Sequence, residues 1–282
     1  MPDSTRSTAF CGSGTLARMG SRGTHAGRIP AGIRTFPFRP FPVPDVMISV
    51  CMATYNGERF LHRQLETILP QLADGDELVI ADDSSTDGTV AIVRSFADPR
   101  IRLFTGNRFL SPIFNFEFAL KQARGDILVL ADQDDVWLDN KLAVVRDCFA
   151  GESRRPYLVV LDARVVDENE AMIHPSVLRK LKAGPGFWKN LYDNRYLGCC
   201  MAFSRDLLDR ALPFPRRIPM HDIWLGQLCE RIGTTAFVPE ITMQYRKHGA
   251  SLTDFRIEFR PWLQIKRRVV LAWNLLCRSY LS

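Results

Sequence analysis

Three carboxylates directly follow a short apolar segment near the middle of the chain. Asp132, Asp134 and Asp135 come after residues 127–131, in the sequence Gly-Asp-Ile-Leu-Val-Leu-Ala-Asp-Gln-Asp-Asp. Because Asp132 and Asp134 flank one residue, a bend there directs both side chains toward one cation, and Mg²⁺ or Mn²⁺ prefers such oxygen ligands. The alternative is that the acids only cap a helix expected over residues 139–149, where the helix dipole favours negative charge.

Asp82 and Asp83 end a second short apolar segment, residues 77–81. They are either nucleotide ligands or a capping turn, and Asp87 is a candidate for such a cap. The first apolar segment precedes Thr54, and neither a G-x-G-x-x-G pattern nor a Walker lysine follows it. We therefore expect a metal and basic side chains to hold phosphates, while carboxylates such as Asp82 and groups near Thr54 hold the base or ribose.

Two further polar groups lie later in the chain. Asp222, in the sequence His-Asp-Ile-Trp-Leu, is expected in the first turn of a helix, where it is either a helix-end acid or a general base. Arg246 and His248 belong to the sequence Arg-Lys-His-Gly. Basic residues beside a glycine suit a diphosphate and its metal, although a single histidine is more often structural.

Alternating strands and helices must position these residues. The apolar patterns predict strands over 46–53, 77–81, 101–104 and 127–131, and helices over 58–72, from 86 or 87, over 114–123 and over 139–149. This alternation is typical of an α/β fold with a mostly parallel, twisted sheet and right-handed crossovers. Because ligands bind at the carboxyl ends of such strands, the two acidic strand ends are expected to form one cleft.

The pattern weakens after residue 150. A fifth strand is predicted over 157–166, followed by a long loop over 167–198 of the kind that forms lids or binding loops. A strand is predicted over 198–203, and its first residue, Gly198, is expected to come close to a ligand. Residues 237–245 are expected to be extended.

Composition limits the class of protein. The chain has 282 residues, 46% of them hydrophobic, and a net charge of +6 that is concentrated toward its two ends. This distribution argues against a nucleic-acid binder. Residues 1–44 are predicted to be a disordered basic tail, with Met47 as a second possible start. The seven cysteines show no C-x-x-C pattern, which indicates a reduced, cytoplasmic protein without a zinc site.

A basic amphipathic helix is predicted near the end of the chain, within the segment 251–282. It has one apolar stripe and four cations off that stripe, and two interpretations stay open: packing on the body of the protein, or peripheral association with the inner, anionic face of a membrane. The stripe consists of Trp262, Ile265, Val269, Trp273, Leu276 and Tyr280, and the cations are Lys266, Arg267, Arg268 and Arg278.

Taken together, the motifs resemble the inverting glycosyltransferase family 2 with the GT-A fold, over most of residues 47–250. Five motifs occur in the family's order, and the Asp-Gln-Asp-Asp-x-Trp form is most similar to the bacterial rhamnosyltransferase branch. They are Ser49-Val50-x-x-Ala53-Thr54-Tyr55-Asn56-Gly57, Asp82-Asp83-Ser84-Ser85-Thr86-Asp87-Gly88-Thr89, Gly125-Asp126 leading to Asp132-Gln133-Asp134-Asp135-x-Trp137, His221-Asp222-x-Trp224 and Tyr245-Arg246-x-His248-Gly249.

The resemblance implies a nucleotide-sugar-binding half over 45–150 and an acceptor half over 151–250. The implied role of each residue follows the family's motifs. Thr54, Tyr55, Asp82, Asp83 and Asp132 bind the nucleotide, Asp134 and His248 bind Mg²⁺ or Mn²⁺, Arg246 contacts phosphate, Asp222 is the catalytic base, and Gly198 and Trp224 face the acceptor.

The implied reaction moves a sugar, L-rhamnose or a similar hexose, from a dTDP- or UDP-sugar to a hydroxyl of a glycan or lipid-linked glycan in surface polysaccharide synthesis. Two other functions stay open from the residues themselves. The acids would also suit a two-metal phosphoesterase, or they would belong to a non-catalytic module that binds nucleotide-sugars.

Overall fold

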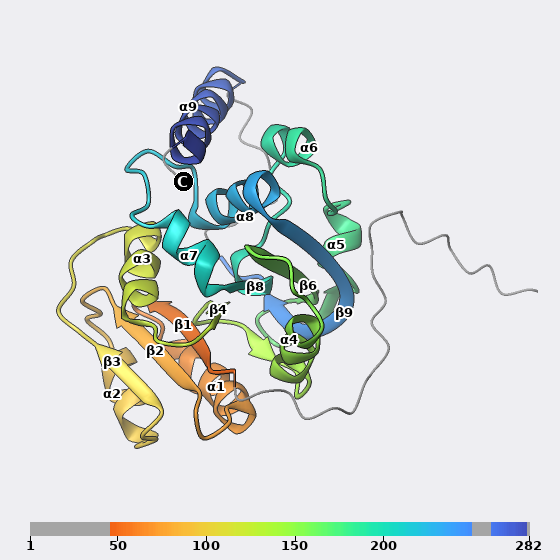
Figure 1. The fold of residues 1–282 in the computed structure, drawn as a ribbon. Coiled ribbons are helices and arrows are strands. Elements are labelled where there is room, and N and C mark those ends of the chain that lie inside the picture. Colours follow the sequence, from red (N-terminus) through yellow and green to blue (C-terminus); the bar gives the residue numbers. More distant parts are fainter. Residues whose placement is uncertain (1–45, 250–260, 281–282) are drawn as a thin grey trace, which may run out of the picture. The chain divides into compact units, whose positions relative to one another are not determined.

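The computed structural model describes residues 46–249 and 261–280 (Figure 1). The predicted tail over 1–44 and residues 250–260 lie outside this part of the chain. Nine strands of the described residues form one sheet, in the order β3-β2-β1-β4-β8-β6-β9-β5, with β7 paired to β6. The predicted α/β class is therefore confirmed.

The first half of the sheet is parallel throughout, as the sequence predicts. It consists of β3 (Ile101–Phe104), β2 (Glu77–Asp82), β1 (Ile48–Thr54) and β4 (Ile127–Ala131). Every residue of β2 and β4 is buried. A strand covered on both faces has a continuous apolar sequence. This explains why the predicted bounds of β2 and β4 agree with the observed ones to within one residue.

The second half of the sheet is mixed. β8 (Met201–Ser204) runs antiparallel to both β4 and β6 (Tyr157–Val166), whereas β9 (Thr234–Arg246) is parallel to β6. The short strands β5 (Val136–Trp137) and β7 (Met172–His174) pair antiparallel with β9 and β6. As a result, the carboxyl ends of β1, β2, β4, β6 and β9 lie at one edge, together with the start of β8.

Helices cover both faces of the sheet. In Figure 1, α3, α7 and α8 lie above the strands and α1 and α4 below them. Helix α1 ends at Ile68 in a 3₁₀ turn, Leu69–Gln71, because Pro70 has no N–H to continue the helix. The helices are α1 (Glu58–Ile68), α2 (Thr89–Ser95), α3 (Pro112–Gln122), α4 (Lys141–Ala150), α5 (Val177–Lys180), α6 (Phe187–Tyr192), α7 (Arg205–Ala211), α8 (His221–Ile232) and α9 (Pro261–Tyr280).

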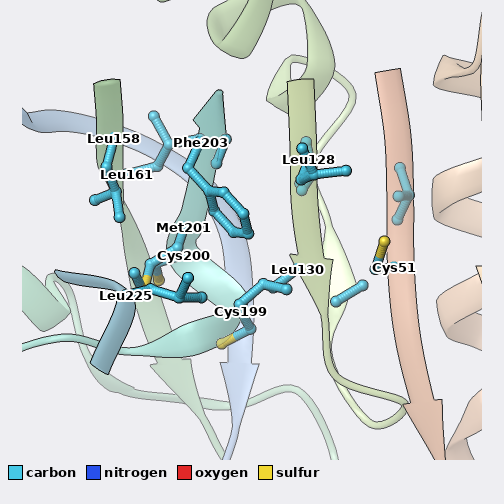
Figure 2. Close-up of a cluster of buried hydrophobic side chains, with 14 of the residues drawn as sticks. Cys51, Leu128, Leu130, Leu158, Leu161, Cys199, Cys200, Met201, Phe203 and Leu225 are labelled. Carbon is cyan, nitrogen blue, oxygen red and sulfur yellow. The ribbon is translucent and has the colours of Figure 1, made fainter. Parts of the chain in front are cut away.

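The core is continuous where β4, β8 and β6 lie side by side. Figure 2 shows Leu128 and Leu130 of β4 beside Phe203 of β8, with Leu158 of β6 beyond. Each of these side chains is fully buried. Cys199, just before β8, lies at the edge of this apolar cluster. The strands that carry the acidic motifs are therefore held by packing on both sides.

A polar network fastens the opposite, amino-terminal edge of the sheet. Ser49 Oγ donates to Glu77 Oε1 at 2.6 Å and accepts a hydrogen bond from the Gly125 backbone N at 2.7 Å. Arg102 pairs with the same Glu77 carboxylate at 2.7 Å. These bonds join β1, β2 and the residues that precede β4, so they fix the register of the strands whose far ends carry the acids.

Gly125 leaves no room for a side chain in this network. A Cβ there would lie 2.6 Å from Ser49 N and 2.7 Å from Met47 O, which are backbone atoms. Gly125→Ala should lower the free energy of unfolding by about 1–3 kcal/mol, measured by urea denaturation. Gly75 also precedes a strand by two residues, but a Cβ there meets nothing within 4 Å. Gly75→Ala should change stability by less than about 1 kcal/mol, and equal losses in the two variants would contradict this account.

Candidate active site

A cleft of about 820 Å³ opens at the edge where the parallel strands end. Thr54 and Tyr55 reach it from the end of β1, Asp83 from the end of β2, and Asp132 and Asp134 from the end of β4. The two acidic strand ends thus meet in one cleft, as predicted. His248, which follows β9, lines the same cleft, and Phe60, Asn115 and Phe116 add walls from α1 and α3.

The two acids after β2 have different surroundings. Asp82 is 1% exposed and does not line the cleft. Its carboxylate accepts hydrogen bonds from Thr54 Oγ1 at 3.0 Å and from Ser85 N at 2.9 Å. Asp83 lines the cleft and accepts from Phe109 N at 2.6 Å, so it also shapes the loop before α3. Asp82 therefore sets the position of Thr54, whereas Asp83 faces the space where a ligand fits.

Gln133 is a site residue that sequence reasoning missed. Its side-chain Oε1 accepts from Tyr55 N at 2.9 Å, and its Nε2 donates to Tyr55 O at 3.0 Å. This two-bond contact ties the loop after β1 to the acidic motif after β4. The side-chain amide of glutamine offers a donor and an acceptor on neighbouring atoms, which matches the N–H and C=O of one backbone residue. A glutamine between two aspartates is the signal in the sequence.

The acids after β4 do not cap a helix. Helix α4 begins at Lys141 with Asn140 at its N-cap, and β5 lies between the acids and that helix. Asp132 is partly buried, and burial followed by the negative charge of Asp134 raises the pKa of Asp132 to about 7. Asp135 is 1% exposed, and burial together with the charges of Asp134 and Asp132 raises its pKa well above the usual value.

Lys141 supplies a buried positive charge behind these acids. The side chain is fully buried, its Nζ donates to Cys199 O at 2.7 Å, and the same nitrogen lies 4.1 Å from the centroid of the Trp137 ring. Burial lowers the pKa of Lys141, while the neighbouring Cys200, Cys199, Asp135 and Asp132 oppose that shift. Nothing in the sequence distinguishes it from an ordinary surface lysine at the start of a helix.

The two basic residues after β9 have different surroundings as well. His248 Nε2 lies 2.7 Å from Asp134 Oδ2, so the two predicted metal ligands are adjacent. Arg246 is 4% exposed and does not line the cleft. Its guanidinium donates to Asp134 O at 2.9 Å and to Glu168 O at 2.8 Å, and its backbone N donates to Asp135 Oδ1 at 3.0 Å. Arg246 therefore stabilises the turn over residues 132–135, which we call the acidic turn, without facing the cleft itself.

Asp222 occupies the first turn of α8, as predicted, but outside the lining of the cleft. It is 7% exposed, and burial raises its pKa to about 6. Its negative charge is one cause of the raised pKa of Asp132, so it faces the same acidic region. A carboxyl group that titrates near neutral pH is matched to proton transfer.

Gly198 and His221 surround Asp222. A Cβ on Gly198 would lie 3.0 Å from His221 Nε2 and 3.8 Å from Asp222 Cβ, so this glycine allows the close approach of β8's start to α8. The His221 ring stacks on Phe116, with centroids 4.3 Å apart, and neither of its nitrogens has a partner among the described residues. His221 is a second residue that the sequence analysis missed.

Trp224 is a core residue. Its side chain is fully buried, and its Nε1 donates to Ala211 O at 3.1 Å. It therefore holds α8 against the end of α7. Trp224 was predicted to face the acceptor, but a buried side chain can affect an acceptor only by setting the position of α8.

Oxygen donors for a hard cation are present in the cleft. Asp134 and His248 offer a carboxylate and an imidazole, and Asp135 Oδ2 is a buried oxygen without a partner in the described part of the chain. Asp132, Asp135 and Cys199 each place one ligand atom within 4.8 Å of the others. Burial raises the pKa of the Cys199 thiol well above its usual value. The carboxylate oxygens of the site are the ligands that Mg²⁺ or Mn²⁺ prefers.

Two curated bacterial proteins illustrate the sequence relationship. The chain is 35% identical over 98 residues to the "UDP-Glc:alpha-D-GlcNAc-diphosphoundecaprenol beta-1,3-glucosyltransferase WfgD" of Escherichia coli, a region that covers 35% of this chain and 39% of WfgD. It is 26% identical over 228 residues to the "dTDP-rhamnosyl transferase RfbG" of Shigella flexneri, covering 74% of this chain and 75% of RfbG. The chain thus spans about two fifths of WfgD and three quarters of RfbG.

Solved structures share the fold. S. aureus TarS 1-349 in complex with UDP-GlcNAc superposes with a TM-score of 0.61 at 18% identity, over 80% of this chain and 66% of that one. The mannosyltransferase PcManGT from Pyrobaculum calidifontis, in complex with GDP-Man and Mn2+, gives 0.58 at 21% identity, over 87% and 68%. The predicted GT-A fold is therefore confirmed.

The family itself follows from the sequence match. The model of the family described as "Glycosyl transferase family 2" matches residues 49–212, more than half of the chain. This range contains the ends of β1, β2 and β4, whose side chains line the cleft. The chain therefore belongs to glycosyl transferase family 2.

Proposed function

We propose that this protein transfers a sugar from a nucleoside diphosphate sugar to a hydroxyl of a glycan or lipid-linked glycan, with inversion at the anomeric carbon. The observation that carries the proposal is the composition of one cleft. Asp132, Asp134 and His248 line it together with nucleotide-facing groups, and the buried Asp222 acts electrostatically on Asp132 from the first turn of α8.

The donor occupies the cleft between β1, β2 and β4. Thr54, Tyr55, Asp83 and Asp132 face this space and hold the base and ribose, and Asp82 contributes by fixing Thr54. The name of RfbG supports a dTDP-linked rhamnose, and the name of WfgD supports a UDP-linked hexose. The name of WfgD gives a sugar on diphosphoundecaprenol as the acceptor, which supports our assignment of this chain to polysaccharide assembly.

Asp134 and His248 would hold Mg²⁺ or Mn²⁺, and a bound cation would supply positive charge opposite the diphosphate leaving group. The Mn2+ and GDP-Man bound to PcManGT support this assignment. Arg246 affects diphosphate binding indirectly, because its hydrogen bonds hold Asp134 and Asp135 in position.

Asp222 is the general base. It takes the proton from the acceptor hydroxyl, whose oxygen attacks the anomeric carbon from the face opposite the diphosphate. The carbon–oxygen bond to the diphosphate breaks as the new bond forms, so the configuration inverts in one displacement. Gly198 supports this role because its missing side chain lets the backbone pass close to His221 and Asp222 in the first turn of α8. The acceptor half, residues 151–250, supplies this side of the site.

The proposed location is the cytoplasm, at the inner face of the membrane. Six cysteines of the described residues are free thiols, which fits a reducing compartment. Among the described residues, no helix combines the length and the apolar character needed to cross a bilayer.

Removing the proposed metal ligand should abolish metal-dependent donor binding. We expect the parent to bind one sugar from a panel of dTDP- and UDP-sugars with Mn²⁺ or Mg²⁺, and to release its nucleoside diphosphate slowly. In Asp134→Ala this metal-dependent binding should weaken by at least about tenfold, measured by calorimetry. The exposed Asp74→Ala is the matched control and should bind like the parent. Failure to bind any nucleotide-sugar with either metal, or hydrolysis of a phosphodiester instead, would contradict the proposal.

Loss of the base should affect turnover and leave donor binding intact. In Asp222→Asn we expect the rate of transfer, or of donor hydrolysis with water as acceptor, to fall by about 10²–10⁴. Because the base must be ionised and its pKa is about 6, the parent's kcat/KM should fall about tenfold per pH unit below that value. Asp209→Asn, an exposed change on α7, is the control. A variant at position 222 that keeps full activity would rule out this base.

The same carboxyl group should make stability depend on pH. Its pKa rises from 3.8 in the unfolded chain to about 6 when buried, so the folded state binds the extra proton and loses stability as pH rises between these values. Relative to the parent, Asp222→Asn should gain up to roughly 3 kcal/mol between pH 3 and pH 7. Chemical denaturation of both proteins across this range measures the difference, and a constant difference would show that Asp222 is not desolvated.

A further inference from the structure

Helix α9 is fastened to the body of the protein along one face. Leu271 and Leu275, four residues apart, are 0% and 1% exposed, and the helix contacts α8 and α6. Arg278 donates hydrogen bonds to Leu212 O at 2.7 Å and to Pro213 O at 2.5 Å, at the end of α7. These contacts fix which side of α9 turns outward.

The outward face is apolar. Trp262, Val269, Trp273 and Leu276 are 78%, 62%, 66% and 41% exposed. Their spacing of seven, four and three residues places them on one stripe, and at 100° per residue that stripe lies opposite Leu271. The helix therefore packs on the protein through a different face from the predicted apolar stripe, whose described members all face solvent. The side chains of Ile265 and Tyr280 lie outside the described residues.

Helix α6 extends this apolar surface. Trp188 and Tyr192, also four residues apart, are 78% and 71% exposed. The Arg268 guanidinium of α9 lies 4.5 Å from the centroid of the Tyr192 ring, so the two helices adjoin, and Figure 1 shows them next to each other. We call this region the α6–α9 surface; it consists of Trp188, Tyr192, Trp262, Val269, Trp273 and Leu276.

The charge around the α6–α9 surface is positive. Lys266 and Arg267 are exposed on α9, and residues 261–282 contain no aspartate or glutamate. Asp193, the acid that follows α6, is paired with Arg195 at 3.4 Å. Large exposed apolar areas of this kind mark interaction sites, and a flanking excess of cations selects an anionic partner.

A hollow of about 400 Å³ joins the α6–α9 surface to the loop before α8. Two arginines of that loop, Arg216 and Arg217, line it together with Val269 and Trp273 of α9. Guanidinium groups beside an apolar wall and an indole ring match the boundary between lipid phosphates and acyl chains, where tryptophan and arginine are favoured.

We propose that the α6–α9 surface docks the protein on an anionic lipid bilayer, with the tryptophans at headgroup level and the surrounding cations near lipid phosphates. Helix α9 lies along the bilayer, because it exposes Lys266 and Arg267 and is held to the protein by Leu271 and Leu275 on its other side. A second copy of the chain is a poorer occupant, since it would bring Lys266 and Arg267 against cations of the same sign. The proposal does not depend on the transfer reaction, because binding needs neither donor nor acceptor.

Flotation of the full chain with vesicles tests the proposal. We expect binding to vesicles of phosphatidylcholine with about a third phosphatidylglycerol, little binding to phosphatidylcholine alone, and release at high salt. Each positive charge near the membrane contributes roughly fivefold to binding. The double variant Lys266→Glu/Arg267→Glu should therefore weaken vesicle binding by at least about tenfold. Trp188→Ser/Trp273→Ser should weaken binding by about tenfold or more.

Matched variants separate this surface from general effects. Met172→Ser/Ile173→Ser removes two exposed apolar side chains from β7, and Arg94→Glu/Arg124→Glu reverses two exposed charges elsewhere. Both controls should bind like the parent, and thermal unfolding should show that all four variants fold. The absence of vesicle binding, equal binding to neutral vesicles, or equal losses in the controls would overturn the proposal. The proposal would also be overturned if light scattering showed that the parent is a dimer and that the tryptophan variant is a monomer.

Discussion

Repulsion between carboxylates at the end of β4 is the constraint around which the site is arranged. Asp132, Asp134 and Asp135 lie within four residues, and their charges raise the pKa of Asp132 and Asp135 after burial has already done so. The opposing groups arrive from three later elements: Lys141 from α4, the backbone and side chain of Arg246 from β9, and His248 just beyond it. The acidic turn is therefore stable only when the second half of the chain has folded against the first.

The fold could be predicted from the sequence where burial leaves a simple pattern. Strands β3, β4 and β6 occupy the predicted residues. For β4, which is buried along its whole length, the reason is its uninterrupted apolar sequence. The antiparallel pairs of the second half could not be predicted in this way. Strands β5 and β7 have two and three residues, too few for a period to be recognised, and the partner of a strand is not encoded in its own periodicity.

The site was predictable to the extent that residue type reveals function. Acids at strand ends, with a histidine after a late strand, do converge in one cleft. Burial was not predictable: Arg246 and Trp224 have the types of ligand-binding residues, yet their polar atoms are engaged by the protein itself. Lys141 is the converse case, since its type and place suggest a surface residue, but its Nζ meets a carbonyl 58 residues further along the chain. Such contacts depend on the path of the chain, which motif spacing does not contain.

After β7, which pairs with β6, the chain leaves the sheet and returns to it at β8, which also pairs with β6. Pairing of Leu158–Val160 with Met201–Phe203 sets the register of these two strands without reference to the length of chain between them. The part of the segment between β6 and β8 that carries α5 and α6 can lengthen, shorten or be replaced while Glu168 and Cys199, near the segment's two ends, keep their contacts with Arg246 and Lys141. Over evolutionary time, this part of the segment can therefore diverge faster than the acidic residues at the end of β4, although both belong to one polypeptide.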